Sequence, residues 1–371
     1  MWGEAPSVSL TILIPLFDVA GIATYALDTM SDSLVKGVAG VTTDDQTNAA
    51  ERRAKGEFVR GVSGVRNWIE EGGKYPPESG RYHLYVAYNC PWCHRVLLGR
   101  AVMGLEDAIT VDVLFPNRST DDEPRGPNLW KFCPEGQVVL NKKFVKFDSC
   151  TADTVNGKRY VKEVYELAGV MDQKSVPILF DKKTGTVVNN ESAEILRMFG
   201  SAMKPLGTRK DVDLYPKDKS ADIDEVNDWI YKEIANGSYK AGFSSSQEVY
   251  ETAYHMFFKA MDRLNELLGK NKFLVGDHVT EADLRLFPPI FRFDPVYHSR
   301  FKLNKCFLWE YKNIWRWMQD MMGLPGMEQV SDAEYLDHCK QGYFGRSGNG
   351  TVPVGPAGYP ECYANPHWSH K

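Results

Sequence analysis

The sequence predicts an α/β domain followed by an all-α domain. From residue 81 to residue 200, β-rich apolar runs alternate with runs of helical periodicity, a succession typical of an α/β fold. From residue 220 to residue 340, the periodicity is helical almost throughout. The chain of 371 residues is longer than one typical domain, and its 43% hydrophobic content is enough for a substantial packed core.

The α/β domain is predicted to begin with a strand that leads directly into a helix. A second strand follows, and clusters of turn residues then predict an insertion. Two more strands are joined as a hairpin by the turn Lys183–Gly185, and a last helix ends at Gly200. In this order the segments are residues 82–88, 95–102, 110–115, 116–170, 175–180, 186–188 and 191–199. This is the thioredoxin-like order of elements.

The all-α domain contains four predicted helices. The third begins at Thr280–Asp283, which resembles a capping box with aspartate in the glutamate position. The other three span residues 223–235, 247–268 and 307–322. The predicted organisation is an N-terminal arm, a thioredoxin-like domain with its insertion, an all-helical domain and an irregular C-terminal tail, over residues 1–60, 61–212, 213–340 and 341–371.

The N-terminal arm holds a rather apolar stretch, residues 8–23. A signal peptide would begin with basic residues, but Glu4 is the only charged residue before this stretch, and Asp18 interrupts it. We interpret the stretch as an amphipathic or core-docking arm, with the remnant of a targeting segment as the alternative.

The sequence Cys90–His94, CPWCH, falls at the predicted junction between the first strand and the first helix. A cysteine at such a junction meets free backbone N–H groups and the positive end of the helix dipole, which favour an anion. The thiolate is the nucleophilic form of cysteine, so this position favours sulfur chemistry at Cys90. Pro91 fits the first helical turn, where its missing N–H costs nothing.

Three other interpretations of this motif are open. Cys-x-x-Cys-His is also the attachment signature of c-type haem, which would require export. A zinc site would need a second Cys/His pair at ligand spacing, whereas the remaining cysteines occur singly. The third interpretation is a pair of buried structural cysteines near a helix start. The singly placed cysteines are Cys133, Cys150, Cys306, Cys339 and Cys362.

Pro177 is unusual within an otherwise strand-like run, because proline cannot donate to a β-ladder. It marks either an edge or bulge position, or a cis-proline beside an active site. In the second case Val176 would offer its backbone to a peptide-like ligand. Glu191 and Ser192 begin a helix, whose N–H groups and serine hydroxyl suit a carboxylate, although such a pair is also an ordinary helix start.

Together with Cys90 and Pro177, the pair Glu191 and Ser192 resembles the glutathione site of glutathione transferases. Five separated motifs narrow the resemblance to the glutathionyl-hydroquinone reductases, the xi class of these transferases, over about residues 60–356. Two features depart from the family pattern: Cys93 stands where many members have alanine, and Tyr343–Ser347 replaces a Tyr-Tyr-x-Ser-His segment. The matching motifs are Cys90–Arg95, Glu191–Ile195, Asn236–Phe243, Thr280–Phe287 and Arg292–Tyr297.

The resemblance implies the reduction of a glutathionyl-hydroquinone with glutathione as co-substrate and without a metal. Cys90 would attack the glutathione sulfur, and a second glutathione would resolve the mixed disulfide. Cys93 is a possible resolving residue. Tyr239 and Tyr297 would act as catalytic residues around the hydroquinone, with Tyr343 as a possible third. The residues implied to bind glutathione are Trp130, Val176, Pro177, Glu191 and Ser192.

Two other functions compete with this one. The dithiol of Cys90 and Cys93 would also suit an omega-like or glutaredoxin-like thiol transferase or a dehydroascorbate reductase. The other alternative is a non-catalytic binding protein that retains the transferase fold.

The composition limits which classes of binding partner and which cellular compartments we expect for this protein. A net charge of −5 and a pI near 6.0 exclude general nucleic-acid binding through a basic surface. A mean hydropathy of −0.38 without a long apolar run argues against a membrane span. Seven cysteines without framework spacing suit a reducing compartment. We expect a cytoplasmic homodimer, or a plastid or other organellar protein if a targeting segment is removed.

Overall fold

The computed structural model of the chain describes residues 48–365. The apolar stretch at residues 8–23, interpreted above as an arm or targeting remnant, lies outside the described residues. The described part of the predicted arm contains one short helix, α2 (Ala49–Ala54).

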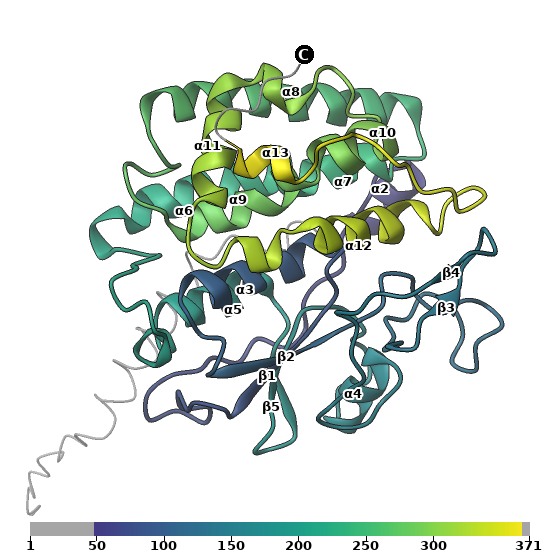
Figure 1. The fold of residues 1–371 in the computed structure, drawn as a ribbon, viewed down its shortest axis with the longest axis vertical. Coiled ribbons are helices and arrows are strands. Elements are labelled where there is room, and N and C mark those ends of the chain that lie inside the picture. The colour runs from purple at the N-terminus through teal and green to yellow at the C-terminus, as the bar shows by residue number, and fades with distance from the viewer. Residues whose placement is uncertain (1–47, 366–371) are drawn as a thin grey trace, which may run out of the picture. The chain divides into compact units, whose positions relative to one another are not determined.

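The α/β part is built on a four-stranded mixed sheet in the order β2-β1-β5-β6 (Figure 1). The central strands β1 (Tyr82–Val86) and β5 (Ile178–Asp181) are buried along their whole length. β1 runs parallel to β2 (Ile109–Val113) and antiparallel to β5. β5 pairs antiparallel with β6 (Thr186–Asn189). The four predicted strands are therefore confirmed, each with slightly shifted ends.

Two helices pack side by side against this sheet. α3 (Pro91–Val102) follows β1, and α5 (Ser192–Gly200) follows β6. Gly99 allows their close approach, because a Cβ atom there would lie 2.4 Å from the Leu196 side chain. Together these elements confirm the predicted α/β fold with thioredoxin-like order.

The segment predicted as an insertion, residues 116–170, is more regular than expected. It holds a two-stranded hairpin, β3 (Gln137–Val138) and β4 (Phe144–Val145), whose turn includes Lys142 with a positive φ of 64°. It also holds helix α4 (Val161–Leu167), which completes the alternation of strands and helices between β2 and β5. The seven-residue length of α4 leaves only a short periodic signal in the sequence.

The helical part follows, and all four helices predicted there are present. The long helix α8 (Gln247–Lys270) passes through Gly269 instead of stopping before it. The capping box of α9 (Glu281–Phe291), formed by Thr280 and Asp283, is confirmed. The remaining α-helices are α6 (Ser220–Trp229), α7 (Asn236–Gly242), α10 (His298–Arg300), α11 (Lys312–Met322), α12 (Ala333–Phe344) and α13 (Glu361–Ala364). The π- and 3₁₀-turns are η2 (Lys204–Leu206), η3 (Lys217–Lys219), η4 (Ile230–Ala235), η5 (Phe293–Tyr297), η6 (Leu308–Glu310) and η7 (Glu328–Val330).

The C-terminal segment differs from the irregular tail predicted over residues 341–371. Helix α12 extends into it as far as Phe344, and α13 brings Cys362 and Tyr363 into buried positions. Helix α12 was not predicted because polar residues occupy several of its buried positions, among them His338 and Gln341, and these obscure the apolar periodicity.

Helices α3 and α9 join the α/β part to the helical part (Figure 1). Pro289 inside α9 has no N–H group, so it cannot donate to the carbonyl of Arg285 one turn earlier. The buried Arg95 of α3 donates to that carbonyl instead, with Nε 3.2 Å from the oxygen. Arg95 therefore stabilises the junction between α3 and α9.

Asp283 fixes the start of α9 from within the core. Its carboxylate accepts hydrogen bonds from the backbone N–H of Leu274, the backbone N–H of Thr280 and the indole of Trp317, each at 2.9 Å. The Thr280 hydroxyl also donates to it at 3.1 Å, so four donors converge on one fully buried carboxylate, and Asp283 holds this part of the fold together.

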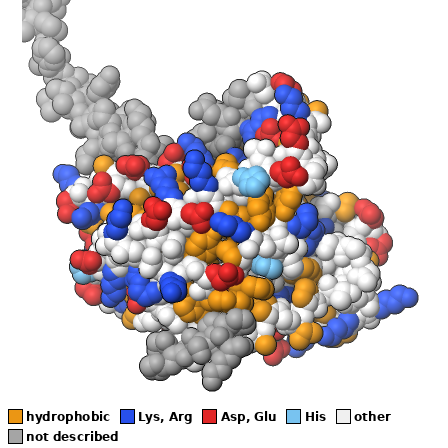
Figure 2. All heavy atoms as spheres, turned by 90° about the horizontal axis from the view of Figure 1, so that it is seen from above, with side chains coloured by type: hydrophobic (Ala, Val, Ile, Leu, Met, Phe, Trp, Pro, Cys, Tyr) orange, Lys and Arg blue, Asp and Glu red, His pale blue; other side chains and the backbone are white. Residues whose placement is uncertain are grey.

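The face seen in Figure 2 shows acidic and basic side chains interspersed around a band of hydrophobic ones. Such mixing gives this face no field of a single sign. Within residues 48–365, no helix combines the length and the apolar character that crossing a membrane requires.

Candidate functional site

Cys90 occupies the N-cap position of α3, directly after the turn that ends β1. Its extended backbone (φ −84°, ψ 118°) and Pro91 at the first helical position are typical of a helix start. The side chain is 8% exposed, so its sulfur lies near the end of the helix and largely shielded from bulk water. Local sequence therefore places this thiol where the helix dipole favours a thiolate.

The surroundings of Cys90 favour its anionic form. Burial alone would raise the pKa of the thiol. This effect of burial is outweighed by hydrogen bonds to the sulfur and by a nearby positive charge, which lower the pKa of Cys90 to about 6. The hydrogen bonds come from the Cys93 thiol and from the backbone N–H groups of Cys93 and Trp92, and the charge is that of Arg60. A substantial fraction of Cys90 is then thiolate near neutral pH, which is the form that attacks sulfur.

Cys93 lies one turn along α3 and is fully buried. Burial and the neighbouring Cys90 sulfur raise the pKa of Cys93 well above its ordinary value. Its sulfur also faces the backbone N–H of Ala87 at 3.4 Å. The two cysteines thus divide into a reactive thiolate and a protonated thiol that donates to it.

The Val176–Pro177 peptide bond lies across from Cys90 and is cis, as one of the two interpretations of Pro177 predicted. The Cys90 thiol faces the Val176 carbonyl, with sulfur and oxygen 3.8 Å apart. Backbone of the Val176–Pro177 pair therefore borders the reactive sulfur, where a peptide-like ligand would meet it.

Glu191 and Ser192 begin helix α5 on the same side of the site. Glu191 caps the helix by accepting from the backbone N–H of Ala193 at 3.2 Å, and it also accepts from the Ser63 hydroxyl at 3.0 Å. Both residues line the same pocket as Cys90. The pair is therefore both a helix cap and part of the pocket wall.

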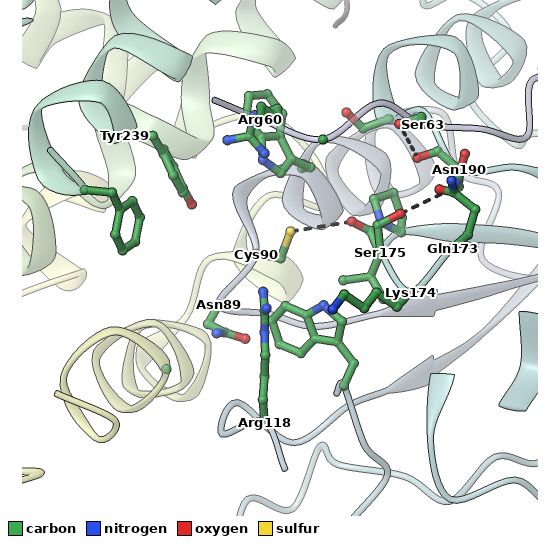
Figure 3. Close-up of a pocket in the computed structure, with 18 of the residues that line it drawn as sticks. Arg60, Ser63, Asn89, Cys90, Arg118, Gln173, Lys174, Ser175, Asn190 and Tyr239 are labelled. Atoms are coloured by element: carbon green, nitrogen blue, oxygen red, sulfur yellow. Dashed lines mark hydrogen bonds between the residues drawn. The ribbon is translucent and has the colours of Figure 1, made fainter. Parts of the chain in front are cut away.

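A pocket of about 650 Å³ surrounds Cys90. Figure 3 shows Ser63, Gln173 and Asn190 on one side of the sulfur and Tyr239 on the other. The α/β part supplies the first side, and η4, α7 and α12 supply the second. A pocket of this size, lined by polar and charged side chains around a reactive atom, suits a polar, charged ligand.

Trp130 comes from the predicted insertion and lines the pocket as expected. It is 6% exposed, and the guanidinium of Arg118 lies over its ring, 4.2 Å from the centroid. This stacking fixes Arg118 with its charged end toward Cys90 (Figure 3).

Tyr239 and Tyr343 meet at the side of the pocket opposite Glu191, and their hydroxyl groups are hydrogen-bonded to each other. Burial raises the pKa of both phenols, so both hydroxyls stay protonated at neutral pH. The expectation that Tyr343 contributes to the site fits this arrangement. Two protonated phenols near a thiolate are suitable proton donors.

Tyr297 does not line the pocket, although the family resemblance led us to expect that it would contact the substrate directly. It is 0% exposed and is not among the residues lining the pocket. It stacks on Phe301 at 4.6 Å and packs behind Tyr239 and Tyr343. The π-turn η5, in which the Tyr297 N–H bonds to the carbonyl of Arg292 five residues earlier, holds it there.

The pocket also holds residues that the sequence did not reveal, among them Arg60, Arg118 and Asn89. Arg60 lies over the ring of Trp92, 4.1 Å from its centroid, and Arg118 and Asn89 flank Cys90. Arg60 and Arg118 come from irregular segments far from the motif, so only the fold brings them to it. Asn89 directly precedes Cys90, which was the one local signal available.

His94, at the end of the cysteine motif, has a structural role. The ring of His94 is fully buried, with Nδ1 2.9 Å from Arg292 and Nε2 3.3 Å from the Ser331 hydroxyl. Burial and the charge of Arg292 hold the pKa of His94 well below its ordinary value. Within residues 48–365, no three His, Cys, Asp or Glu side chains are grouped as metal ligands.

Comparison with known families matches both parts of the chain. The family described as glutathione S-transferase, N-terminal domain, matches residues 89–202, and the corresponding C-terminal domain matches residues 247–320. Glutathionyl-hydroquinone reductase YqjG of Escherichia coli (strain K12) is 36% identical over 315 residues, which cover 81% of this chain and 89% of that protein. Glutathionyl-hydroquinone reductase PcpF of Sphingobium chlorophenolicum is 38% identical, with 81% and 90% covered.

Solved structures agree with these relatives. The crystal structure of the glutathione-S-transferase Xi from Phanerochaete chrysosporium superimposes with a TM-score of 0.73 at 40% identity, covering 82% of this chain and 94% of that one. The glutathione-bound structure of YqjG superimposes with a TM-score of 0.70 at 37% identity, covering 79% and 92%.

Proposed function

This chain belongs to the glutathionyl-hydroquinone reductase family, the Xi class of the glutathione transferases, and on that premise we propose that it reduces glutathionyl-hydroquinones with glutathione. The observation that carries the proposal is the single pocket that holds the Cys90 thiolate between the cis-proline backbone and the Tyr239–Tyr343 hydroxyl pair. The Cys90 thiolate suits attack on sulfur, and the Tyr239–Tyr343 hydroxyl pair suits protonation of the leaving carbon.

The first step is attack by the Cys90 thiolate on the sulfur of the conjugate. A sulfur–sulfur bond forms between Cys90 and glutathione, and the bond between that sulfur and the ring carbon breaks. The electron pair of the broken bond stays on the ring carbon, which takes up a proton and is thereby reduced. The two sulfurs are oxidised to the mixed disulfide.

Tyr239 and Tyr343 are proposed to donate that proton. They are also proposed to orient the ring by hydrogen bonds to its hydroxyl groups. Their raised pKa values keep both hydroxyls protonated while Cys90 is ionised. Opposite protonation states of this kind are what a thiolate nucleophile and a neutral acid require at one pH. Tyr297 acts in this scheme as a positioning residue that supports the pair from behind.

The second step releases the product of glutathione oxidation. A second glutathione thiolate attacks the glutathione sulfur of the mixed disulfide, which gives glutathione disulfide and restores the Cys90 thiolate. The net reaction converts a conjugate and one glutathione into a hydroquinone and glutathione disulfide. Cys93 can remain a thiol throughout, because its raised pKa disfavours the nucleophilic thiolate form.

Glutathione is proposed to lie along the side of the pocket formed by the α/β part. Glu191 and Ser192 would hold its γ-glutamyl end at the start of α5, and the Val176 backbone would pair with its central residue. Trp130 would pack against the other end of the tripeptide. This placement brings the glutathione sulfur to Cys90.

The test is turnover of a glutathionyl-hydroquinone, with hydroquinone and glutathione disulfide quantified in parallel. We expect equal amounts of the two products, and mass spectrometry of enzyme exposed to conjugate alone should find glutathione on Cys90. Conjugate cleavage that leaves Cys90 unmodified, or reduction only of mixed-disulfide substrates, would refute the proposal. The second outcome would favour the thiol transferase alternative. The homodimer and the cytoplasmic location stay predictions.

A further inference from the structure

The charges that line the pocket are unequal in number. Two acidic side chains line it, Asp172 and Glu191. Five cationic side chains line it, namely Arg60, Arg118, Lys174, Arg300 and Arg346. Glutathione carries one ammonium and two carboxylates, so the pocket holds more cations than glutathione alone requires.

Arg118 is one of the cations beside the reactive sulfur. Its guanidinium stacks on Trp130 and extends toward Cys90, close enough for its charge to interact with Cys90, Tyr239 and Tyr343 (Figure 3). Among residues 48–365, no carboxylate forms an ion pair or a hydrogen bond with Arg118. The Cys90 thiolate is the anion whose charge favours this half-buried guanidinium, and Arg118 still has donors to offer to an anionic group of a ligand.

Arg346 faces the same region from the C-terminal end of α12. Its guanidinium donates to Asn128 Oδ1 at 2.5 Å, which ties it to the same segment that carries Arg118. Arg346 is exposed at the mouth of the pocket that Arg118 also lines. The charge of Arg118 acts together with burial to lower the pKa of Arg346, as expected for two like charges on one pocket wall. An anion between them would relieve the repulsion between these like charges.

Asn89 provides a neutral group beside the two cations. It is 8% exposed, its Nδ2 donates to the Pro116 carbonyl at 3.3 Å, and its Oδ1 has no hydrogen-bond partner in the described part of the chain. Gly342 leaves room for it, because a Cβ atom there would lie 2.1 Å from Asn89 Nδ2. A buried acceptor that lines a pocket and lacks a donor points to a hydroxyl group on the ligand.

We propose that Asn89, Arg118 and Arg346 form an acceptor wall that selects glutathionyl-hydroquinones whose ring carries a carboxylate beside a hydroxyl. This inference rests on the proposed function. The ring hydroxyl donates to Asn89 Oδ1, and the carboxylate lies between the two guanidinium groups. Planar guanidinium groups bind carboxylates through paired, charge-assisted hydrogen bonds.

The first measurement uses the wild-type protein and two matched substrates. These are the glutathionyl conjugate of a hydroquinone carboxylic acid and the conjugate of its methyl ester, which keeps the shape but removes the charge. We expect kcat/KM to be at least about tenfold higher for the acid than for the ester, because one charge-assisted contact contributes enough binding energy for such a factor. Equal values, or a preference for the ester, would overturn the proposal.

The second measurement tests whether the wall causes the preference. Arg118→Gln should reduce the acid-to-ester ratio of kcat/KM about tenfold, toward one. Arg125→Gln is the matched control, because Arg125 lies in the same insertion, is not among the pocket residues and pairs with Glu166 at the surface. The control should keep the wild-type ratio. If Arg118→Gln does not fold, Gly342→Ala, which displaces Asn89, serves as the second variant.

The third measurement separates the hydroquinone from glutathione as the source of the anion. The glutathione dependence of clearing a preformed Cys90–glutathione disulfide is compared between wild type and Arg118→Gln. A large rise in KM for glutathione with an unchanged acid-to-ester ratio would assign Arg118 to a glutathione carboxylate and overturn the proposal. Absence of turnover with both conjugates would instead refute the proposed function, so the two failures are distinguishable.

Discussion

Replacing Cys93 by alanine tests how the site keeps Cys90 ionised. The Cys93 thiol donates to Cys90 and is the first contribution that lowers the pKa of the reactive sulfur against the effect of burial. Hydrogen bonds to charged groups contribute about 1.5–3 kcal/mol, and a thiol is a weak donor, so the lower end applies. One pKa unit corresponds to about 1.4 kcal/mol, and we therefore expect Cys93→Ala to raise the pKa of Cys90 by about one unit.

The consequence for activity depends on pH. Since the pKa of Cys90 is about 6, roughly half of the wild-type enzyme carries the thiolate at pH 6. In Cys93→Ala, about a tenth of the enzyme would carry the thiolate at pH 6, so the rate at that pH should fall about fivefold. Above both pKa values the thiolate is complete in each protein, and the variant should retain most of its deglutathionylation activity.

The assay measures kcat/KM for a glutathionyl-hydroquinone and the rate of Cys90 alkylation, both across the pH range. Cys93→Ser is the matched control, because its hydroxyl keeps a donor of similar size at the same position. An unchanged alkylation profile in Cys93→Ala would show that the hydrogen bond does not set the pKa. Loss of activity at high pH, with Cys90 trapped as its glutathione adduct, would show that Cys93 resolves the disulfide and would favour the glutaredoxin-like alternative.

Other predictions follow from the same geometry. Cys90→Ser should abolish turnover without changing the circular dichroism spectrum, because a hydroxyl is a much poorer nucleophile toward sulfur. Glu191→Ala should raise KM for glutathione more than it changes the alkylation rate of Cys90, and loss of its cap should cost about 1 kcal/mol in thermal unfolding. Tyr343→Phe should lower kcat about tenfold or more while glutathione affinity, measured by calorimetry, stays unchanged. Asp283→Ala removes the acceptor of four donors and should destabilise the fold by about 3 kcal/mol or more in denaturant titration. Conjugation of glutathione to chlorinated aromatic compounds should be slow, because in the proposed mechanism Cys90 forms a disulfide with glutathione instead of leaving the glutathione thiolate free.

The parts of the site that could be predicted carry their signal in a few consecutive residues. Cys90 follows a strand and precedes a helix-forming run with proline at its first position, so its N-cap geometry is local. Pro177 interrupts a strand pattern, and the cis bond is one of two physical explanations for that. The four strands and the helix starts were predictable for the same reason.

The parts that could not be predicted depend on contacts between distant segments. Arg118 and Arg346 are 228 positions apart, and neither segment has a motif that indicates the other. Tyr297 lies in a family-like motif, but the π-turn η5 rotates it behind the pocket wall, and Pro295 within that turn was the only sequence sign of irregularity. Helix α12 escaped notice because polar side chains such as His338 fill its buried positions.

The two parts of the chain contribute different functions to the pocket. One provides the reactive thiolate, and the other is proposed to select the hydroquinone. Cys90, Cys93 and the start of α5 come from the α/β part and provide the thiolate and the groups proposed to hold glutathione. Tyr343 and Arg346 come from α12 and its C-terminal end, and they line the side of the pocket where we propose that the ring lies. Changes in α12 can therefore alter which hydroquinone is accepted without disturbing the environment that ionises Cys90, since Cys93, Trp92 and Arg60 supply that environment from elsewhere.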